Sequence, residues 1–280
     1  MSDPIYDNLD PERYLYHYTA IRTYRKILHR MRLKISPYAK SNDPYETKER
    51  FLTVFSKNNS PRNVFSRLAS AKKNLNTELS KYGLISFATD KQPLVVDQLS
   101  NRGCSLLSMW AHYAKNHKGV CIVLDRQTLL ADLSTKYSEQ AHCDYVNYVD
   151  MFTTDAHRYR QDASNVYIQE ELSSETAIST TIERSLSSNF LLKDKSWAGE
   201  QEFRCVLPYI KDNEFIDIRN SLVGLIVGAR VKADAARKLE RISQEKYPRL
   251  FVRHLQFSDY FYLSEILPSR KELKSTNSQA

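Results

Sequence analysis

Hydrophobic and polar residues follow two periods along this chain, and the periods predict its secondary structure. Alternation every second residue, or a short unbroken apolar run, predicts a β-strand, whereas apolar residues three and four apart predict a helix. The predicted strands are residues 13–18, 32–36, 84–88, 120–124, 143–149, 201–207, 214–218, 222–227, 250–255 and 260–263. The clearest predicted helices are residues 21–31, 106–115, 125–133 and 233–247.

Turn and capping residues divide these segments. Thr19 and Asp125 stand immediately before predicted helices, where a side-chain oxygen can cap the first turn. Strands and helices follow one another irregularly, which favours an α+β fold over a doubly wound sheet. We therefore expect one α+β domain over residues 1–268, with helical insertions at about 60–82 and 153–193 and a disordered tail at 269–280.

Composition excludes several classes of protein. The chain has 280 residues, of which 41% are hydrophobic, and no apolar run approaches the ~20 residues that a membrane span needs. The first residues lack the basic and apolar regions of a signal peptide, so we expect a cytoplasmic protein without membrane contact. The four scattered cysteines, Cys104, Cys121, Cys143 and Cys205, are expected to be reduced core thiols.

Charge is unevenly distributed. The formal net charge is +8, and residues 1–83 hold 16 Lys and Arg against 8 Asp and Glu. A basic first third can meet nucleic acid or another polyanion. It lacks the dense Lys/Arg runs of a basic arm, so a well-solvated surface explains it equally well.

The stretch of residues 197–204 carries the most unusual chemistry. In a strand that starts early, Glu200, Glu202 and Arg204 would point the same way. Gly199 would open the backbone ahead of this strand, and Trp197 would anchor the loop. A solvated Arg–Glu pair is the simpler explanation. Because a charge is costly inside a protein, we expect Gln at position 200 or 202 to leave the protein folded.

Other candidate chemistry is sparse. His17 lies in a predicted strand among tyrosines, where a packed core histidine is the common case. His112 and His117 are five residues apart without a carboxylate or cysteine at metal-ligand spacing, so we expect no metal. The six glycines form no phosphate-binding loop, and no nucleophile elbow is present. The two carboxylates and His17 remain the strongest combination.

Five motifs occur together and in order, and they resemble an uncharacterised bacterial family (domain of unknown function 2971). They are residues 15–19 (Leu-Tyr-His-Tyr-Thr), 41–46 (Ser-Asn-Asp-Pro-Tyr-Glu), 85–87 (Ile-Ser-Phe), 109–119 (Met-Trp-Ala-His-Tyr-Ala, then His-Lys-Gly) and 197–204 (Trp-x-x-Glu-x-Glu-Phe-Arg). The resemblance extends from about residue 14 to residue 228. The family name itself implies no chemistry.

The same motifs resemble, more weakly, the ADP-ribosyltransferase superfamily. That resemblance implies a mixed, split β-sheet core with surrounding helices, and NAD as substrate without a metal. It implies Glu202 and Glu200 as catalytic residues, and NAD-binding roles for His17, Thr19, Ser86, Phe87, Tyr45 and Arg204. Asn42, Asp43, Trp110 and His112 would bind substrate or position a loop. The tyrosine that usually marks the middle motif has no clear counterpart here.

The mechanism implied by this resemblance is physically reasonable for these residue types. Cleavage of the nicotinamide–ribose bond passes through an oxocarbenium-like state, which a fixed carboxylate such as Glu202 stabilises. Glu200 would handle an acceptor. On this hypothesis His17, Phe87 and Glu202 line one cleft.

Three functions therefore remain open. The first is an NAD-dependent ADP-ribosyltransferase-like toxin or defence effector, which modifies a protein or nucleic acid acceptor and has an antitoxin-like or defence-system partner. The second is a metal-independent nuclease or nucleic-acid-binding effector that uses the basic first third. The third is a non-catalytic interaction module in which the same motifs are structural.

Overall fold

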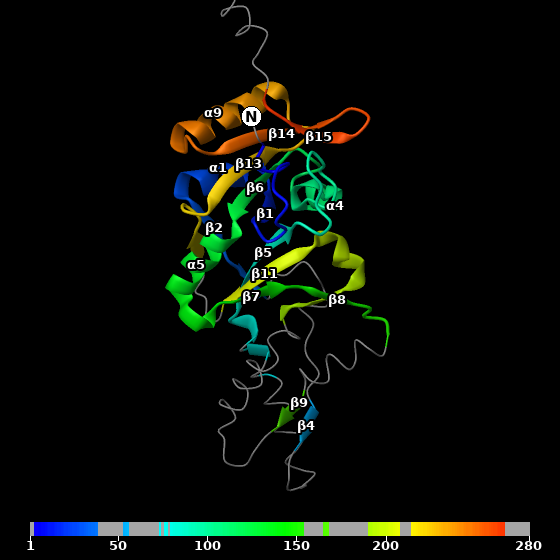
Figure 1. The fold of residues 1–280 in the computed structure, drawn as a ribbon. Helices are drawn as coiled ribbons and strands as arrows, with labels where there is room; N and C mark the ends of the chain where they lie inside the picture. Colours follow the sequence, from blue (N-terminus) through cyan, green and yellow to red (C-terminus); the bar gives the residue numbers. More distant parts are fainter. Residues whose placement is uncertain are drawn as a thin grey trace, which may run out of the picture.

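A mixed β-sheet runs through the centre of the protein (Figure 1). The computed structural model describes residues 3–38, 53–55, 73, 76–77, 79–153, 165–167, 190–207 and 214–266. Within these residues the strand order is β15-β14-β13-β6-β1-β5-β11-β7, and β3 also pairs with β5. β13 and β14 are parallel, and the other neighbours in the sheet are antiparallel.

The central strands match the predicted strand segments closely. They are β1 (Tyr14–Thr19), β3 (Ser36–Pro37), β5 (Gly83–Thr89), β6 (Val120–Asp125), β7 (His142–Tyr145), β11 (Glu202–Leu207), β13 (Leu222–Val227), β14 (Phe251–Phe257) and β15 (Phe261–Ser264). In the described residues, three two-stranded pairs lie outside the main sheet: β2 (Arg32–Lys34) with β12 (Phe215–Asp217), β8 (Asn147–Val149) with β10 (Leu192–Asp194), and β4 (Thr53–Phe55) with β9 (Asn165–Tyr167).

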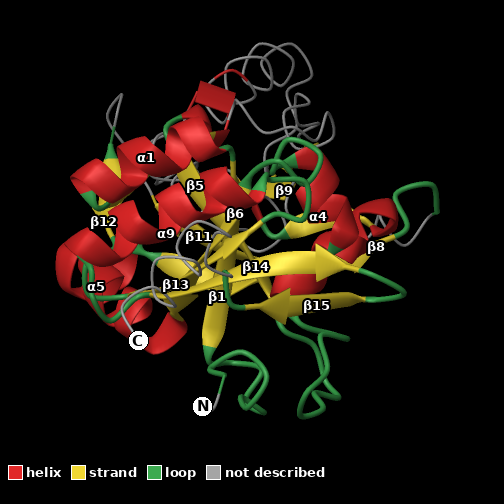
Figure 2. Ribbon diagram, turned by 90° about the horizontal axis from the view of Figure 1, so that it is seen from above, coloured by secondary structure: helices red, strands yellow, loops and turns green. Residues whose placement is uncertain are grey.

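Helices cover both faces of the sheet. α1 (Ile21–Arg30), α5 (Arg126–Tyr137) and α9 (Ala233–Lys246) lie together on one face, and α4 (Leu107–His112) lies on the other (Figure 2). Two hydrophobic clusters correspond to the two faces, one built on α1, α5 and α9 and the other on α4 and the N-terminal segment. The predicted α+β class is therefore confirmed. In the described part of the chain, no helix is both long and apolar enough to span a bilayer.

α1 is held by the apolar stripe that predicts it. In α1 the buried side chains are Tyr24, Ile27 and Leu28, which recur at three- and four-residue spacing. The expected cap of α5 is confirmed, because the Asp125 carboxylate accepts a hydrogen bond from the Thr128 backbone N–H. The expected cap of α1 is wrong, because Ala20 occupies the capping position and Thr19 is still in β1.

The expectation of four reduced thiols is also wrong. Cys143 in β7 and Cys205 in β11 form a disulfide, whereas Cys104 and Cys121 are free and buried. The two bonded residues are 62 positions apart, so no local spacing marks them as a pair. Strand pairing brings the two cysteines together, because it places them directly opposite each other in β7 and β11.

Several predicted features fall on residues outside the described ranges. They include most of the two expected helical insertions, the expected tail, and the candidate residues Asn42, Asp43 and Tyr45. The predicted strand at 143–149 is two strands, because β7 joins the main sheet and β8 pairs with β10. The predicted helix at 106–115 is shorter, since α4 ends at His112.

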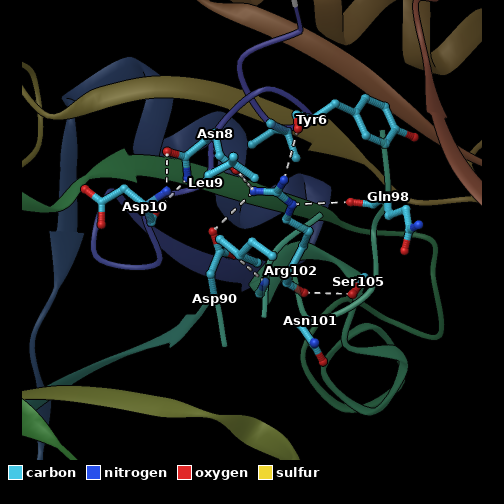
Figure 3. Close-up of polar contacts among 12 residues, drawn as sticks. Tyr6, Asn8, Leu9, Asp10, Asp90, Gln98, Asn101, Arg102 and Ser105 are labelled. Carbon is cyan, nitrogen blue, oxygen red and sulfur yellow. Dashed lines mark hydrogen bonds and ion pairs between the residues drawn. The ribbon is translucent and has the colours of Figure 1, made fainter. Parts of the chain in front are cut away.

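A buried arginine fastens the N-terminal segment to the sheet (Figure 3). The Arg102 side chain is fully buried and donates hydrogen bonds to the backbone carbonyls of Tyr6, Asn8, Val95 and Gln98. The Asp90 carboxylate lies 4.0 Å from the Nη1 atom of Arg102. Burial raises the pKa of Asp90 to about 6, although the Gly103 N–H and the Arg102 charge oppose the rise.

We predict that Arg102→Met lowers the free energy of unfolding by about 3 kcal/mol, because several buried carbonyls lose their donor at once. Arg102→Lys should not retain the wild-type stability, since an ammonium group lacks the planar fork that reaches carbonyls on two segments. Urea unfolding measures both values. Arg13→Met is the control, because its half-exposed ion pair with Asp125 should contribute less than about 1 kcal/mol. Equal stability of the Met variants at 102 and 13 would contradict the fastening role.

Candidate functional site

The main sheet opens between β1 and β5. These strands pair only at Leu15 with Thr89 and at Tyr16 with Ala88, although β1 continues alongside β6 as far as Thr19. β3 occupies the other end of the same β5 edge, with Ser36 opposite Leu84. A cavity of about 260 Å³ lies at this opening and is lined by residues of β1, β3, β5, β11 and α4.

The cavity wall combines aromatic rings with five charged side chains. The aromatic residues are Tyr16, His17, Tyr18, Phe87 and Tyr113, and the charged residues are Lys34, Lys193, Glu200, Glu202 and Arg204. A concave, mostly apolar site with a few convergent polar groups is the usual form of a small-molecule pocket. We therefore take this cavity as the candidate functional site.

Glu202 is held from two sides. Arg204 Nε lies 2.8 Å from Glu202 Oε1, and Arg204 Nη2 donates to Oε2 at 3.1 Å. Lys193 Nζ lies 2.8 Å from the same Oε2 atom. Because Glu202 and Arg204 are two apart in β11, strand alternation places both side chains on one face, as expected from the sequence.

Glu200 joins the same group by a different route. It is the last residue of a 3-10 helix (Lys195–Glu200) and β11 begins at Glu202, so the early strand start that would align Glu200 with Glu202 on one strand face does not occur. Gln201 has φ 47°, in the left-handed region, whereas Gly199 has no positive φ. Glu200 Oε1 accepts from the Tyr113 hydroxyl at 2.7 Å, and Oε2 accepts from Lys193 Nζ at 2.7 Å.

Lys193 thus bridges both carboxylates, and the four charges sum to zero. Lys193, Glu200, Glu202 and Arg204 are between 2% and 6% exposed, so water screens them little. Burial by itself raises the pKa of Glu202, but Arg204 and Lys193 outweigh burial and lower it to about 2. Glu202 is therefore an ionised carboxylate throughout the physiological pH range.

His17 and Phe87 reach the cavity from the other side of the strands. Tyr16, Ala88 and Glu202 are aligned across β1, β5 and β11, so their neighbours in sequence face the opposite way. The His17 ring packs edge-on against Phe87 at 6.0 Å, and its Nδ1 atom lies 3.4 Å from the Ser86 carbonyl oxygen. Burial lowers the pKa of His17, partly offset by this carbonyl, so the ring is neutral at pH 7.

Six of the residues singled out from sequence contribute to the lining of this cavity. They are His17, Ser86, Phe87, Glu200, Glu202 and Arg204. Thr19 is buried at the end of β1 and does not contribute. Trp110 is a core residue whose indole donates to the Cys104 carbonyl, and His112 is exposed at the end of α4. In the described residues, no cluster of three His, Cys, Asp or Glu side chains is arranged to hold a metal ion.

The sequence does not single out two residues that contact the paired carboxylates. Lys193 falls at the end of the expected helical insertion at 153–193, and Tyr113 falls in the predicted helix at 106–115. Charge balance could have indicated Lys193, because two buried carboxylates beside one arginine require a second cation. No local pattern identifies Tyr113, whose hydroxyl reaches Glu200 across 87 positions.

The pairing of Glu202 reverses the expectation that Gln would leave the fold stable. Glu202→Gln leaves Arg204 and Lys193 buried with one carboxylate, so we predict a loss of about 3 kcal/mol in unfolding free energy at pH 7. Glu202 has a depressed pKa, so its contribution is complete above about pH 4.5 and disappears as pH falls towards 2. Urea unfolding of both proteins at several pH values measures this.

A matched control is Glu240→Gln in α9. Burial and the Glu265 charge raise the pKa of Glu240, so removal of its charge should not reduce stability at pH 7. A constant difference between wild type and Glu202→Gln from pH 7 to pH 3 would contradict the assigned role of the ion pairs.

Comparison with known protein families gives a match over part of the chain. Residues 109–205, which are 97 of the 280, match the model of a family described as "Protein of unknown function (DUF2971)". Neither the curated proteins nor the solved structures yielded a match. The matched stretch contains the last two of the five sequence motifs, and the first three lie outside it. The segment that supplies Tyr113, Lys193 and the Glu200–Arg204 group is therefore similar to a family of unknown function.

Proposed function

We propose that the cavity binds NAD and that the protein cleaves the nicotinamide–ribose bond, transferring ADP-ribose to a macromolecular acceptor. The observation that supports this most is a carboxylate, Glu202, kept ionised in the wall of a cavity lined by aromatic rings. A fixed negative charge of this kind stabilises an oxocarbenium-like state. The opening between β1 and β5 also agrees with the split sheet that a resemblance to ADP-ribosyltransferases implies.

In this reaction nicotinamide leaves with the bonding electron pair, and positive charge develops on the ribose. Glu202 remains ionised near neutral pH, so it is suited to electrostatic stabilisation rather than to proton transfer. Tyr16, Tyr18 and Tyr113 give the wall flat surfaces for the nicotinamide or adenine ring. Water or an acceptor nucleophile then attacks the ribose carbon and loses a proton.

Lys193 and Arg204 serve two purposes in the proposal. They orient Glu202, and as buried cations they are suited to the pyrophosphate of NAD. A bound pyrophosphate would compete with the carboxylates for Lys193, which would expose Glu202 Oε2 to the ribose. Glu200, held by Tyr113 and Lys193, would act on the acceptor.

A second candidate is a non-catalytic interaction module. It is favoured by one observation: the four charges of the site are paired among themselves, as in a purely structural ion network. The two candidates differ in a simple measurement, because only the first releases nicotinamide.

We predict that the purified protein releases nicotinamide from NAD and that Glu202→Gln slows this release by roughly two to three powers of ten. Chromatography of the reaction mixture measures the rate, at a temperature where circular dichroism finds each variant folded. Glu202→Asp is a second test, since it keeps the charge but withdraws it from the cavity. Asp125→Asn is the control, because it removes a buried carboxylate elsewhere and Asn still caps α5.

No nicotinamide release by the wild-type protein, with protein and nucleic acid acceptors supplied, would exclude the enzyme and leave the interaction module. Normal release by a folded Glu202→Gln variant would exclude Glu202 as the stabilising group.

The two carboxylates should also differ from each other. We predict that Glu200→Gln preserves hydrolysis of NAD and selectively reduces transfer to the acceptor, because Glu200 contacts Tyr113 rather than Arg204. Radiolabelled NAD separates free from acceptor-bound ADP-ribose. Equal losses of both activities in the two Gln variants would contradict this division of roles.

A further inference from the structure

The three helices on one face of the sheet carry very different surface charge. α1 presents Arg22, Arg25, Lys26, His29 and Arg30 to solvent and has no acidic residue. α5 and α9 carry both signs. The basic side chains of α1 follow the spacing i, i+3, i+4, i+7 and i+8, so they lie on a single helix face, which we call the basic face of α1.

The cations of the basic face also differ in their partners. No carboxylate of the described residues forms an ion pair with Arg22, Arg25, Lys26 or Arg30. Neighbouring helices pair several of theirs: Arg237 with Asp234, Arg241 with Glu245, and Lys136 with Glu214.

The packing of α1 against the rest of the protein does not depend on these cations. α1 is fixed through its other face by Tyr24, Ile27 and Leu28, and the Tyr24 hydroxyl lies 2.7 Å from Ser243 Oγ in α9. Lys246 donates to the carbonyls of Leu28 and His29 and so closes the C-terminal end of the helix. Like charges four apart, such as Arg22 and Lys26, repel each other and weaken the helix.

We infer that the basic face of α1 is a docking surface for the phosphate backbone of a nucleic acid. Four long cations on one helix face match a row of backbone phosphates, which Arg and Lys contact without regard to sequence. The formal net charge of +8 favours the same partner. An anionic membrane fits less well, because the apolar side chains of α1 are directed inward and none is available for insertion.

The position of α1 in the chain connects this surface to the candidate site. α1 follows β1, whose Tyr18 lines the cavity, and precedes β2, whose Lys34 also lines it. A nucleic acid on the basic face therefore lies on the helix that joins two walls of the cavity. The inference does not depend on the reaction proposed for that cavity.

The test is fluorescence anisotropy with labelled single-stranded RNA and duplex DNA of about 20 nucleotides, starting at about 50 mM KCl. The test variant carries Arg22→Gln, Arg25→Gln, Lys26→Gln and Arg30→Gln. The control carries Arg219→Gln, Lys232→Gln, Lys238→Gln and Arg241→Gln, which removes four exposed cations elsewhere. Each variant lowers the formal net charge by four, from +8 to +4, and Gln keeps helix propensity close to that of Lys and Arg.

We expect the α1 variant to bind at least about tenfold more weakly, with a slope of log K against log salt that is smaller by about 3 to 4. The control should stay within about twofold of wild type. Melting temperature should be unchanged or higher in the α1 variant, since repulsion is relieved. Nicotinamide release without nucleic acid should also be unchanged, so failure of the docking surface and failure of the reaction are distinguishable.

Three results would overturn the inference. One is the absence of binding to either nucleic acid by the wild-type protein at the lowest salt. Another is an equal loss of affinity in the two quadruple variants, which would assign binding to net charge alone. The third is binding to phosphatidylserine-containing vesicles but not to nucleic acid, which would make the basic face a lipid surface.

Discussion

The buried ion group of Lys193, Glu200, Glu202 and Arg204 is the constraint on which the candidate site depends. Removing four charges from water is costly, and the cost is offset only when every charge has a partner with good geometry. Here each carboxylate contacts Lys193, and Glu202 also contacts Arg204. The group ties β10 and the 3-10 helix before β11 to the main sheet. The geometry of the cavity wall therefore depends on the balance of charge within the group.

The opening in the sheet explains why this group borders a cavity rather than a packed core. β5 needs partners along its whole edge, but β1 supplies only two pairs and β3 two more. Between them the edge faces His17 and the cavity. Polar backbone groups left by separating strands require side-chain or ligand partners, which is a reason for a binding site to form there.

Two buried guanidinium groups find partners for their charge and their N–H groups in different ways. Arg204 is paired with the Glu202 carboxylate, also donates to the Phe190 carbonyl, and lines the cavity. Arg102 is satisfied mainly by backbone carbonyls and fastens two segments of the chain (Figure 3). A guanidinium bonded mainly to backbone carbonyls is suited to structure, whereas one paired with a carboxylate can exchange that partner for an anionic ligand. The basic face of α1 is a third case, in which the cations remain in water.

Local physics allowed the sequence to determine most of the elements and their buried faces. Apolar periodicity located α1, β5, β6, β11, β13 and α9 within one or two residues, because a buried face requires apolar residues at regular spacing along the chain. Alternation also placed Glu202 and Arg204 side by side. Only the tertiary structure decided which distant residues meet: Lys193 with both carboxylates, Tyr113 with Glu200, and Cys143 with Cys205. These contacts depend on strand order and register, which are set by packing across the whole sheet and leave no local period in the sequence.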